Sequence, residues 1–316
     1  GAAQERRHSR DTGVVMLRTL FFILIFMLAG LVTGCESDRT PLDFNNLERQ
    51  VRQGEESAFR KTAKLLGHPR LSERAYALLM EQGETSVPFL MELIEDADPA
   101  RREAAIAALG NLGARQAAGR IALVLADTTL ERRYVAAWAL GKINDPAFTH
   151  NLIAALDDAN FEVRRQAVRA LVRIHRPAVP ALIETLPDAS PQMARGIIHA
   201  LGDIGDRRAL QPLLDFSTAA NRPEIMLALG KLRDPQATDT LIAGLTDQDW
   251  QVRMNAAMAL GPLAAKEAQE ALKQTLEDEV TVVREWSARS LEMITGQRTL
   301  YRNAKGEMVP PDNVYH

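Results

Sequence analysis

The chain has 316 residues, with 38 Lys and Arg, 41 Asp and Glu and a single Cys. A formal net charge of −3 gives no general basic footprint for nucleic acid, and one Cys excludes both an intrachain disulfide framework and a zinc site built from several cysteines. Aromatic residues make up only 5 % whereas Ala and Leu are abundant, which favours packed helices because Ala and Leu are strong helix formers.

The first part of the chain carries the features of an export signal. From Met16 it reads MLRTLFFILIFMLAGLVTGC, with one early charge, an apolar run that is short for a bilayer-spanning helix, and then small residues. This pattern predicts a signal peptide over residues 16–34. The stretch Val32–Cys35 resembles the lipobox of bacterial lipoproteins, which implies cleavage before Cys35 and lipidation of its sulfur. The alternative is an uncleaved anchor that happens to end in a Cys.

Two short segments flank this signal. Residues 1–15 lie upstream of Met16, and we expect them to be a segment of doubtful origin that takes no part in the fold. Residues 35–41 follow as a polar, lipidated tether, which predicts a protein anchored in the cell envelope after export. By resemblance to the enterobacterial sorting rule, Glu36 after the cysteine favours the outer over the inner membrane.

An internal repeat of about 31 residues fills most of the remaining chain. A leucine, mostly within Ala-Leu-Gly, marks each unit and is called the reference leucine below. Further apolar residues stand fifteen and nineteen residues before it, and their spacing of four is that of a helix. Each unit is therefore predicted to be a first helix, a short polar turn and a second helix. The reference leucines are Leu78, Leu109, Leu140, Leu171, Leu201, Leu229, Leu260 and Leu291.

The repeat resembles the HEAT family, and in particular its short bacterial form, the phycobilisome-lyase HEAT-like repeats. The segments DANFEVRRQAVRALV and DQDWQVRMNAAMALG carry the resemblance. It implies an all-α fold, an α-solenoid of about eight stacked helix pairs, because a helix pair cannot bury its apolar face without neighbours. We expect a capping helix and a divergent first repeat over residues 42–84, the solenoid over 85–296, and an extended tail over 297–316.

An Arg recurs seven residues before most reference leucines, and an Asp stands six residues before that Arg. Opposite charges at a fixed offset in every unit predict structural Asp–Arg pairs that join adjacent turns and helix starts, rather than a recognition surface. The predicted ladder consists of Asp96 and Arg102, Asp127 and Arg133, Asp158 and Arg164, Asp247 and Arg253, and Asp278 and Arg284.

Signatures of catalysis are scarce. The sequence has no phosphate-binding glycine loop, no nucleophile elbow and no H-E-x-x-H motif. Deoxyhypusine hydroxylases build a di-iron centre on HEAT repeats with His-Glu dipeptides, and this chain has no such dipeptide. The sequence therefore predicts a non-catalytic protein without a cofactor or metal.

The variable positions of the second helices predict a binding surface. Positions −6, −2 and +2 relative to the reference leucine vary and share one helix face, which in HEAT arrays lies on the concave side. We call these positions the concave stripe. Arg, aromatic and Met side chains suit protein contacts. The candidates, with Trp286 beside the stripe, are Tyr134, Trp138, Lys142, Arg165, Arg169, Arg173, Arg195, His199, Met254, Met258 and Trp286.

We interpret this stripe as the site for a partner protein or peptide with an acidic segment, and we expect no nucleic-acid partner. Three alternatives stay open for individual residues: a solvated face for the arginines, packing against a neighbouring helix for Trp138 and Tyr134, and core packing for the two methionines. For the whole protein, the alternatives are binding of an anionic glycan or lipid headgroup, or an enzyme subunit whose leader is misread. The sequence predicts no oligomeric state.

Overall fold

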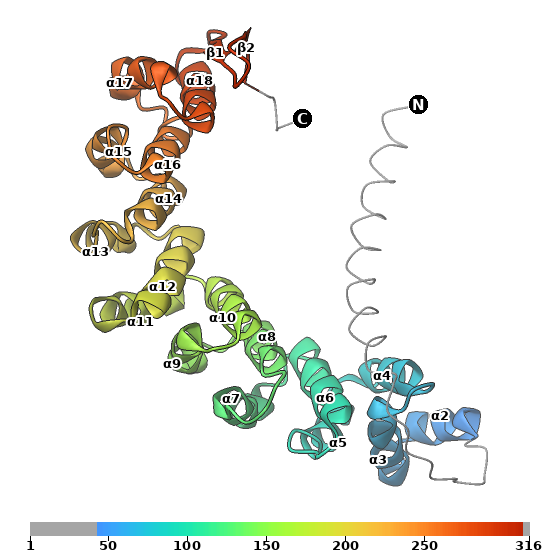
Figure 1. Ribbon diagram of the computed structural model, residues 1–316. Helices are drawn as coiled ribbons and strands as arrows, with labels where there is room; N and C mark the ends of the chain where they lie inside the picture. The colour runs from blue at the N-terminus through green and yellow to red at the C-terminus, as the bar shows by residue number, and fades with distance from the viewer. Residues whose placement is uncertain (1–42, 312–316) are drawn as a thin grey trace, which may run out of the picture.

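Paired helices form two parallel rows that bend into an arc (Figure 1). The computed structural model describes residues 43–311. The first helices of the units form the outer row: α3 (Glu56–Lys64), α5 (Val87–Met91), α7 (Ala118–Ala126), α9 (Thr149–Ala154), α11 (Val179–Thr185), α13 (Leu210–Asp215), α15 (Thr238–Gly244) and α17 (Gln269–Gln274). The second helices form the inner row: α4 (Ser72–Glu81), α6 (Pro99–Asn111), α8 (Tyr134–Ile143), α10 (Phe161–Ile174), α12 (Pro191–Ile204), α14 (Arg222–Leu232), α16 (Trp250–Leu260) and α18 (Thr281–Thr295).

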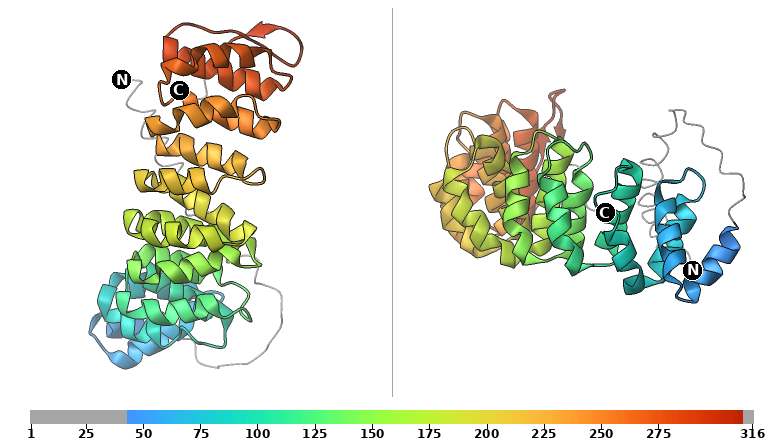
Figure 2. Two further views of the ribbon diagram at one scale, coloured as in Figure 1. Left: turned by 90° about the vertical axis from the view of Figure 1, so that its left-hand side faces the viewer. Right: turned by 90° about the horizontal axis from the view of Figure 1, so that it is seen from below.

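These eight pairs confirm the predicted all-α solenoid of about eight helix pairs. Figure 2 shows the same stack from the side, with the pairs following one another in chain order. Short 3₁₀ helices extend or precede many first helices: η1 (Leu65–Gly67), η2 (Gly83–Ser86), η3 (Arg115–Ala117), η4 (Pro146–Phe148), η5 (Ala155–Asp157), η6 (Arg176–Ala178), η7 (Leu186–Asp188), η8 (Arg207–Ala209), η9 (Pro235–Ala237), η10 (Lys266–Ala268) and η11 (Thr275–Glu277).

Polar residues in the turns start the second helices. The side chains of Asp98, Asn160 and Asp249 each accept a hydrogen bond from a backbone N–H in the first turn of α6, α10 and α16. Such caps satisfy donors that have no partner within the helix. Apolar residues then repeat at helical spacing, and every reference leucine is at most 4 % exposed. The core is therefore one continuous layer between the two rows.

Close backbone contacts join neighbouring second helices, and we call each such junction a seam. In five units the residue after the reference leucine is a glycine that lies against an Ala or Ser of the next second helix. A Cβ on Gly141 would come within 2.8 Å of the backbone Cα of Ala170, and one on Gly202 within 2.9 Å of that of Ala228. Glycine is thus required for the helices to approach this closely. The α10–α12 seam has Val172 at this position instead, and in Figure 1 the inner row changes direction at α12.

The two ends of the solenoid are covered by different elements. Helix α2 (Phe44–Arg52) precedes the first pair at the place of the expected capping helix, and it buries Phe44, Leu47 and Val51. After α18, strands β1 (Tyr301–Arg302) and β2 (Met308–Val309) form an antiparallel hairpin, a regular element that the expected extended tail did not include. Arg284 of α18 donates from Nε to the carbonyl of Arg302 at 2.7 Å, so the hairpin closes the C-terminal end.

Candidate partner-binding surface

Several predicted features lie outside the described residues. These are residues 1–15, the signal peptide, the tether with its Cys35 and Glu36, and the last five residues of the tail. The concave stripe and the Asp–Arg ladder lie within the described part, and the structure assigns partners to their side chains.

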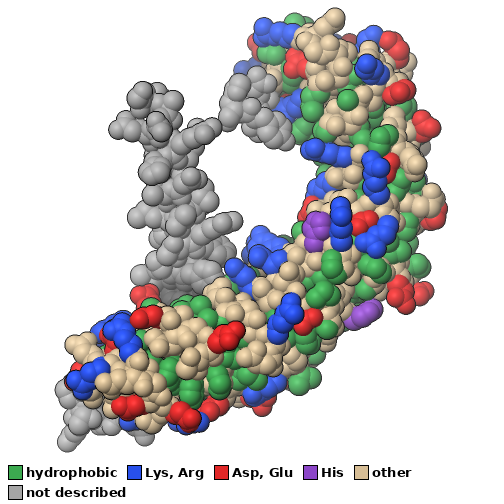
Figure 3. Space-filling view, turned by 180° about the vertical axis from the view of Figure 1, so that it is seen from behind, with side chains coloured by type: hydrophobic (Ala, Val, Ile, Leu, Met, Phe, Trp, Pro, Cys, Tyr) green, Lys and Arg blue, Asp and Glu red, His purple; other side chains and the backbone are tan. Residues whose placement is uncertain are grey.

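The second helices line the inner side of the arc, as the repeat predicts (Figure 1). Reference leucines are buried towards the first helices, and the glycines that follow them face the next second helix. Positions −2 and +2 point opposite to the reference leucine because a helix turns by 100° per residue. These side chains therefore face the concavity, where Figure 3 shows Lys and Arg around the middle of the arc.

The structure contains Asp–Arg pairs, and they join successive units rather than the Asp and Arg that stand six residues apart within one unit. Each ladder Arg except Arg133 donates from Nη1 to the backbone carbonyl of its own unit's Asp, not to the carboxylate. The distances to the carbonyls are 2.9 Å for Arg102 and Asp96, 2.7 Å for Arg164 and Asp158, 2.8 Å for Arg253 and Asp247, and 2.6 Å for Arg284 and Asp278. The guanidinium thus caps the end of the first-helix segment.

Three of the five ladder carboxylates instead pair with an Arg of the preceding unit, 25 residues earlier in the sequence. Asp278 accepts from Nε of Arg253 at 2.7 Å, and both side chains are at most 10 % exposed. Asp158 pairs with Arg133 in the same way, with both side chains 8 % exposed. Asp247 pairs with Arg222, at 2.5 Å. The rungs therefore stitch unit to unit.

Two ladder carboxylates have other partners. Asp96 pairs with Arg101 at 3.0 Å, because Leu71 occupies the place in the preceding unit where the other rungs have their Arg. Asp127 accepts hydrogen bonds from the hydroxyl and backbone N–H of Thr129, which lower its pKa. Arg102 and Arg164 have no carboxylate partner among residues 43–311 in the ion pairs that the structure shows; for Arg164, Ala189 stands where the other rungs have their Asp.

A second set of links, which the sequence analysis missed, joins the opposite edge of the solenoid. Asp206 accepts a hydrogen bond from Arg208 that lowers its pKa to about 2, and its carboxylate also lies 3.9 Å from Arg176 of the preceding unit. Asp234 lies 3.3 Å from Arg207 of its preceding unit. Arg176 and Arg207 are thus engaged in contacts that join successive units at this edge.

The concave arginines at the sides of the stripe are paired. Arg165 meets Glu162 at 2.6 Å, and Arg195 meets Glu224 of the next second helix at 3.1 Å. The i,i+3 spacing of Glu162 could have revealed the first pair. His199 lies between the second pair and Lys231, and burial first, then Lys231, lowers its pKa. The predicted basic centre is thus smaller than the sequence suggested.

The cations in the middle of the stripe are different. Lys142, Arg169 and Arg173 are exposed, and the structure shows no ion pair for any of them within residues 43–311. Lys142 lies over the ring of Trp138, with Nζ 5.5 Å from the ring centroid. These three side chains lie on α8 and α10 and form a compact positive site on the inner surface.

The apolar candidates are half-buried. Tyr134, Trp138 and Trp286 pack against the core with part of their surface, so the alternative of helix packing holds for part of each side chain. Arg289 stacks over Trp286, with its guanidinium carbon 4.5 Å from the ring centroid. Met254 and Met258 are half-buried on α16 and lie farther along the same concave face.

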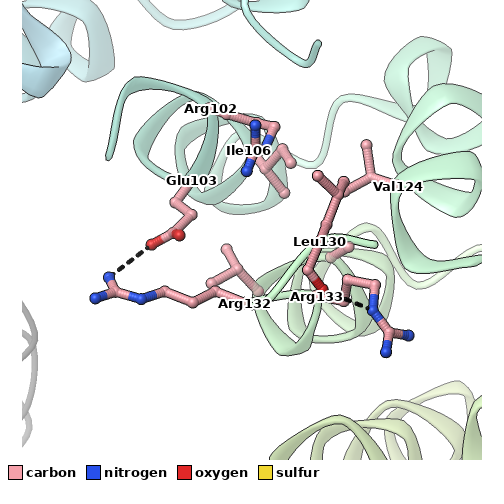
Figure 4. Close-up of a pocket in the computed structure, with 9 residues that line it drawn as sticks. Arg102, Glu103, Ile106, Val124, Leu130, Arg132 and Arg133 are labelled. Carbon is pink, nitrogen blue, oxygen red and sulfur yellow. Dashed lines mark hydrogen bonds and ion pairs between the residues drawn. The ribbon is translucent and has the colours of Figure 1, made fainter. Parts of the chain in front are cut away.

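A shallow depression between α6 and α8 is lined by charged groups that contact one another (Figure 4). Glu103 accepts from Arg132 at 3.0 Å, and Arg133 donates to the carbonyl of Leu130 at 3.0 Å. Burial raises the pKa of Glu103, and Arg132 opposes this shift. These groups are engaged in contacts between and within units, so the depression belongs to the packing of the solenoid.

Residues 43–311 contain neither a cluster of metal ligands nor a membrane-spanning helix. No group of three or more His, Cys, Asp or Glu side chains lies close enough together to hold a metal ion in this part of the chain. Nor does any helix in the same residues have the length and hydropathy needed to cross a membrane.

Two rows of paired helices, with the second helices along the inner face, define an α-solenoid of stacked repeats. The chain belongs to the HEAT-repeat family: the model for HEAT repeats matches residues 61–141, 87–158, 149–226 and 217–292. A comparison with curated proteins finds no match.

Solved structures show the same kind of fold. A chain of the Kap95p–RanGDP structure has a TM-score of 0.55 at 14 % identity, over 79 % of this chain and 41 % of that one. Human deoxyhypusine hydroxylase is 24 % identical over 82 % of this chain and 100 % of its own, with a TM-score of 0.33. The CpcE–CpcF phycocyanin lyase of Nostoc sp. is 24 % identical over 66 % and 94 %, with a TM-score of 0.35. Only the first of these superposes well enough to support the solenoid fold.

Proposed function

We propose that the protein is a non-catalytic, membrane-anchored scaffold that binds a partner protein on the concave face of its solenoid. The observation that carries this proposal is the row of second helices, which presents exposed cations and half-buried aromatic and Met side chains to the concavity. HEAT repeats commonly serve as binding surfaces, and the Kap95p structure, which superposes on this fold, is of a protein that binds RanGDP.

The anchor rests on the sequence. A single Cys at the end of a lipobox-like stretch supports lipidation of Cys35, and the polar tether would place the solenoid near the envelope membrane, with Glu36 favouring the outer membrane. Radiolabelled palmitate should be incorporated into the wild-type protein and not into Cys35→Ala. Incorporation that persists in Cys35→Ala would contradict the anchor.

A photo-crosslinking amino acid can test the concave face in living cells. Placed at Asn111 or Pro262, two exposed stripe positions on either side of the cations, it should give discrete adducts that protease treatment destroys. Placed at Leu123 or Glu184, two exposed positions of the outer row, it should give none of these adducts. Equal adducts from both faces would refute concave binding, and adducts that resist protease would indicate a glycan or lipid.

A further inference from the structure

The equivalent +2 positions of two neighbouring second helices are close enough for their side chains to touch. At the α12–α14 seam these positions hold Asp203 and Lys231, whose carboxylate and ammonium groups lie 2.5 Å apart. The seam itself is set by the close contact of Gly202 with Ala228. A pair of +2 side chains across such a seam is therefore a geometric unit that holds two opposite charges together.

The α8–α10 seam has the same packing but two like charges at these positions. Gly141 lies against Ala170 as closely as Gly202 lies against Ala228. The +2 positions are occupied by Lys142 and Arg173, so the register that makes an ion pair at α12–α14 places two cations beside each other here. Like charges in proximity repel, and a shared anion removes that repulsion.

A third cation completes this arrangement. Arg169 lies one helical turn before Arg173 on the same face of α10, about 6 Å away along the helix axis. Neighbouring packed helices are about 8–10 Å apart, which sets the separation between Lys142 and Arg173 at their bases. The three side chains outline a small triangle on the concave surface with no carboxylate of residues 43–311 paired to it.

We propose that Lys142, Arg169 and Arg173 form a carboxylate-binding site for an extended acidic segment of the partner protein; this deepens the proposed function and rests on it. Side chains at alternate residues of an extended strand point the same way and repeat about every 6.8 Å. Two such carboxylates match the separation of Arg169 and Arg173, and a bend of the flexible Lys142 side chain brings its ammonium group to either of them. Charge-assisted hydrogen bonds of this kind are the strong ones.

The location of the site favours a polypeptide over the other anions. A flat lipid surface cannot follow the inner side of an arc, and α8 and α10 lie on that inner side (Figure 1). The same concave face continues to Met254 and Met258, whose half-buried side chains suit apolar residues of a polypeptide and have no role for a sulfated or carboxylated sugar. Arg is also enriched among the residues that dominate protein interfaces.

Binding of a defined peptide to the full chain in detergent tests the site. The probe is a fluorescent peptide of about ten residues with Glu at alternate positions. An extended chain rises about 3.4 Å per residue, so alternate Glu carboxylates repeat about every 6.8 Å, close to the separation of Arg169 and Arg173. Loss of one charge-assisted contact should weaken binding about tenfold in Arg173→Gln and more in Lys142→Asp, which supplies an internal carboxylate to Arg173. Binding should also weaken as salt is raised.

Lys231→Gln is the matched control, because it removes a +2 lysine that is already paired with Asp203. It should change the affinity for the probe by less than about twofold, which is a smaller effect than the loss of one charge-assisted contact. Circular dichroism must show the same helix content for all variants. A peptide with Gln in place of Glu should not bind.

Two results would overturn the site. One is unchanged probe affinity in both Lys142→Asp and Arg173→Gln. The other is binding of a sulfated glycan or of anionic phospholipid micelles with the expected variant dependence while the peptide fails to bind. The photo-crosslinks from Asn111 and Pro262 test the scaffold function separately. If they persist after either of these two results, the proposed scaffold function stands and only the assignment of this site is wrong.

Discussion

The α8–α10 and α12–α14 seams share their packing and differ in where they place charge. Each brings a glycine of one second helix against an alanine of the next. The α8–α10 seam has its ion pair in the turn, where the side chains of Arg133 and Asp158 are buried. Its exposed concave cations Lys142, Arg169 and Arg173 have no carboxylate partner among the described residues. The α12–α14 seam has Ala194 at the ladder position and carries its ion pairs on the concave face, as Arg195–Glu224 and Lys231–Asp203.

This difference separates the groups that build the solenoid from those available to a partner. A buried rung fixes two units without using the inner surface, so the inner positions are free to vary in charge. At the α12–α14 seam, where the rung is absent, concave side chains link the two units and neutralise one another. The sharpest test of the comparison is therefore to remove one carboxylate from each seam.

Asp158→Ala should be the most destabilising of these changes. It leaves the buried Arg133 guanidinium without a counter-charge, and breaking a buried pair costs about 3 kcal/mol or more in the free energy of unfolding. Asp203→Ala removes a pair whose side chains are 40 % and 37 % exposed, and it should cost under about 1 kcal/mol. Urea unfolding of both variants measures the difference. Equal losses would remove the distinction between a structural and a surface pair.

Gly141→Ala and Gly202→Ala should be destabilising to a similar extent, about 1–3 kcal/mol each, because both overpack a contact with the neighbouring backbone. Gly119→Ala is the control, since a Cβ at this exposed helical position meets nothing within 4 Å. It should be stabilising by about 0.5–1 kcal/mol through helix propensity. The same unfolding measurement applies, and a large difference between the two seams would show that their packing is not shared.

The period of the sequence predicts the common packing but not the distribution of charge. The regular spacing of the repeat and the buried reference leucines suffice for the two rows of helices. The individual ladder partners could not be assigned from the sequence because the visible offset of six positions lies within a unit, whereas the carboxylate pairs with the preceding unit. The true separation of 25 residues is one repeat less that offset. Pairing of Arg195 with Glu224 likewise depends on how two units face each other.

Backbone conformation at the ends of the second helices is a further feature without a clear sequence signal. Four residues after the reference leucine the chain has a positive φ in successive units, whether the residue is Gly205 (68°), His175 (66°) or Arg233 (51°). Among these three residues, only the glycine indicates a positive φ in the sequence. The positive φ is therefore imposed by the repeat rather than by the residue that occupies the position.

The ends of α10 and α12 offer a smaller test of the same pair of regions. His175→Gly should be stabilising by about 1 kcal/mol, because a φ of 66° with a ψ of −138° is a glycine conformation. Gly205→Ala should be destabilising by about 1 kcal/mol at the equivalent place in α12. Thermal unfolding of the two variants should therefore shift in opposite directions, and shifts of the same sign would show that the positive φ does not favour glycine at these two positions.

The smallest expected effect concerns the concave cations themselves. Lys142→Asp converts the α8–α10 pair of +2 side chains into the arrangement seen at α12–α14, and Asp203→Lys does the reverse. Each change is worth about 0.5 kcal/mol at an exposed site. Loss of the contact between Lys142 and Trp138 opposes the gain in the first variant. The dependence on salt is therefore the better measurement.

Screening by about 1 M salt shortens the Debye length to about 3 Å and removes most of the charge term while leaving the packing unchanged. Raising the salt should thus lower the stability of Lys142→Asp relative to wild type and raise that of Asp203→Lys. Parallel salt curves for all three proteins would mean that the +2 side chains of α8 and α10 do not interact as their counterparts do. The assignment of a shared anion to Lys142 and Arg173 would then lose its geometric basis.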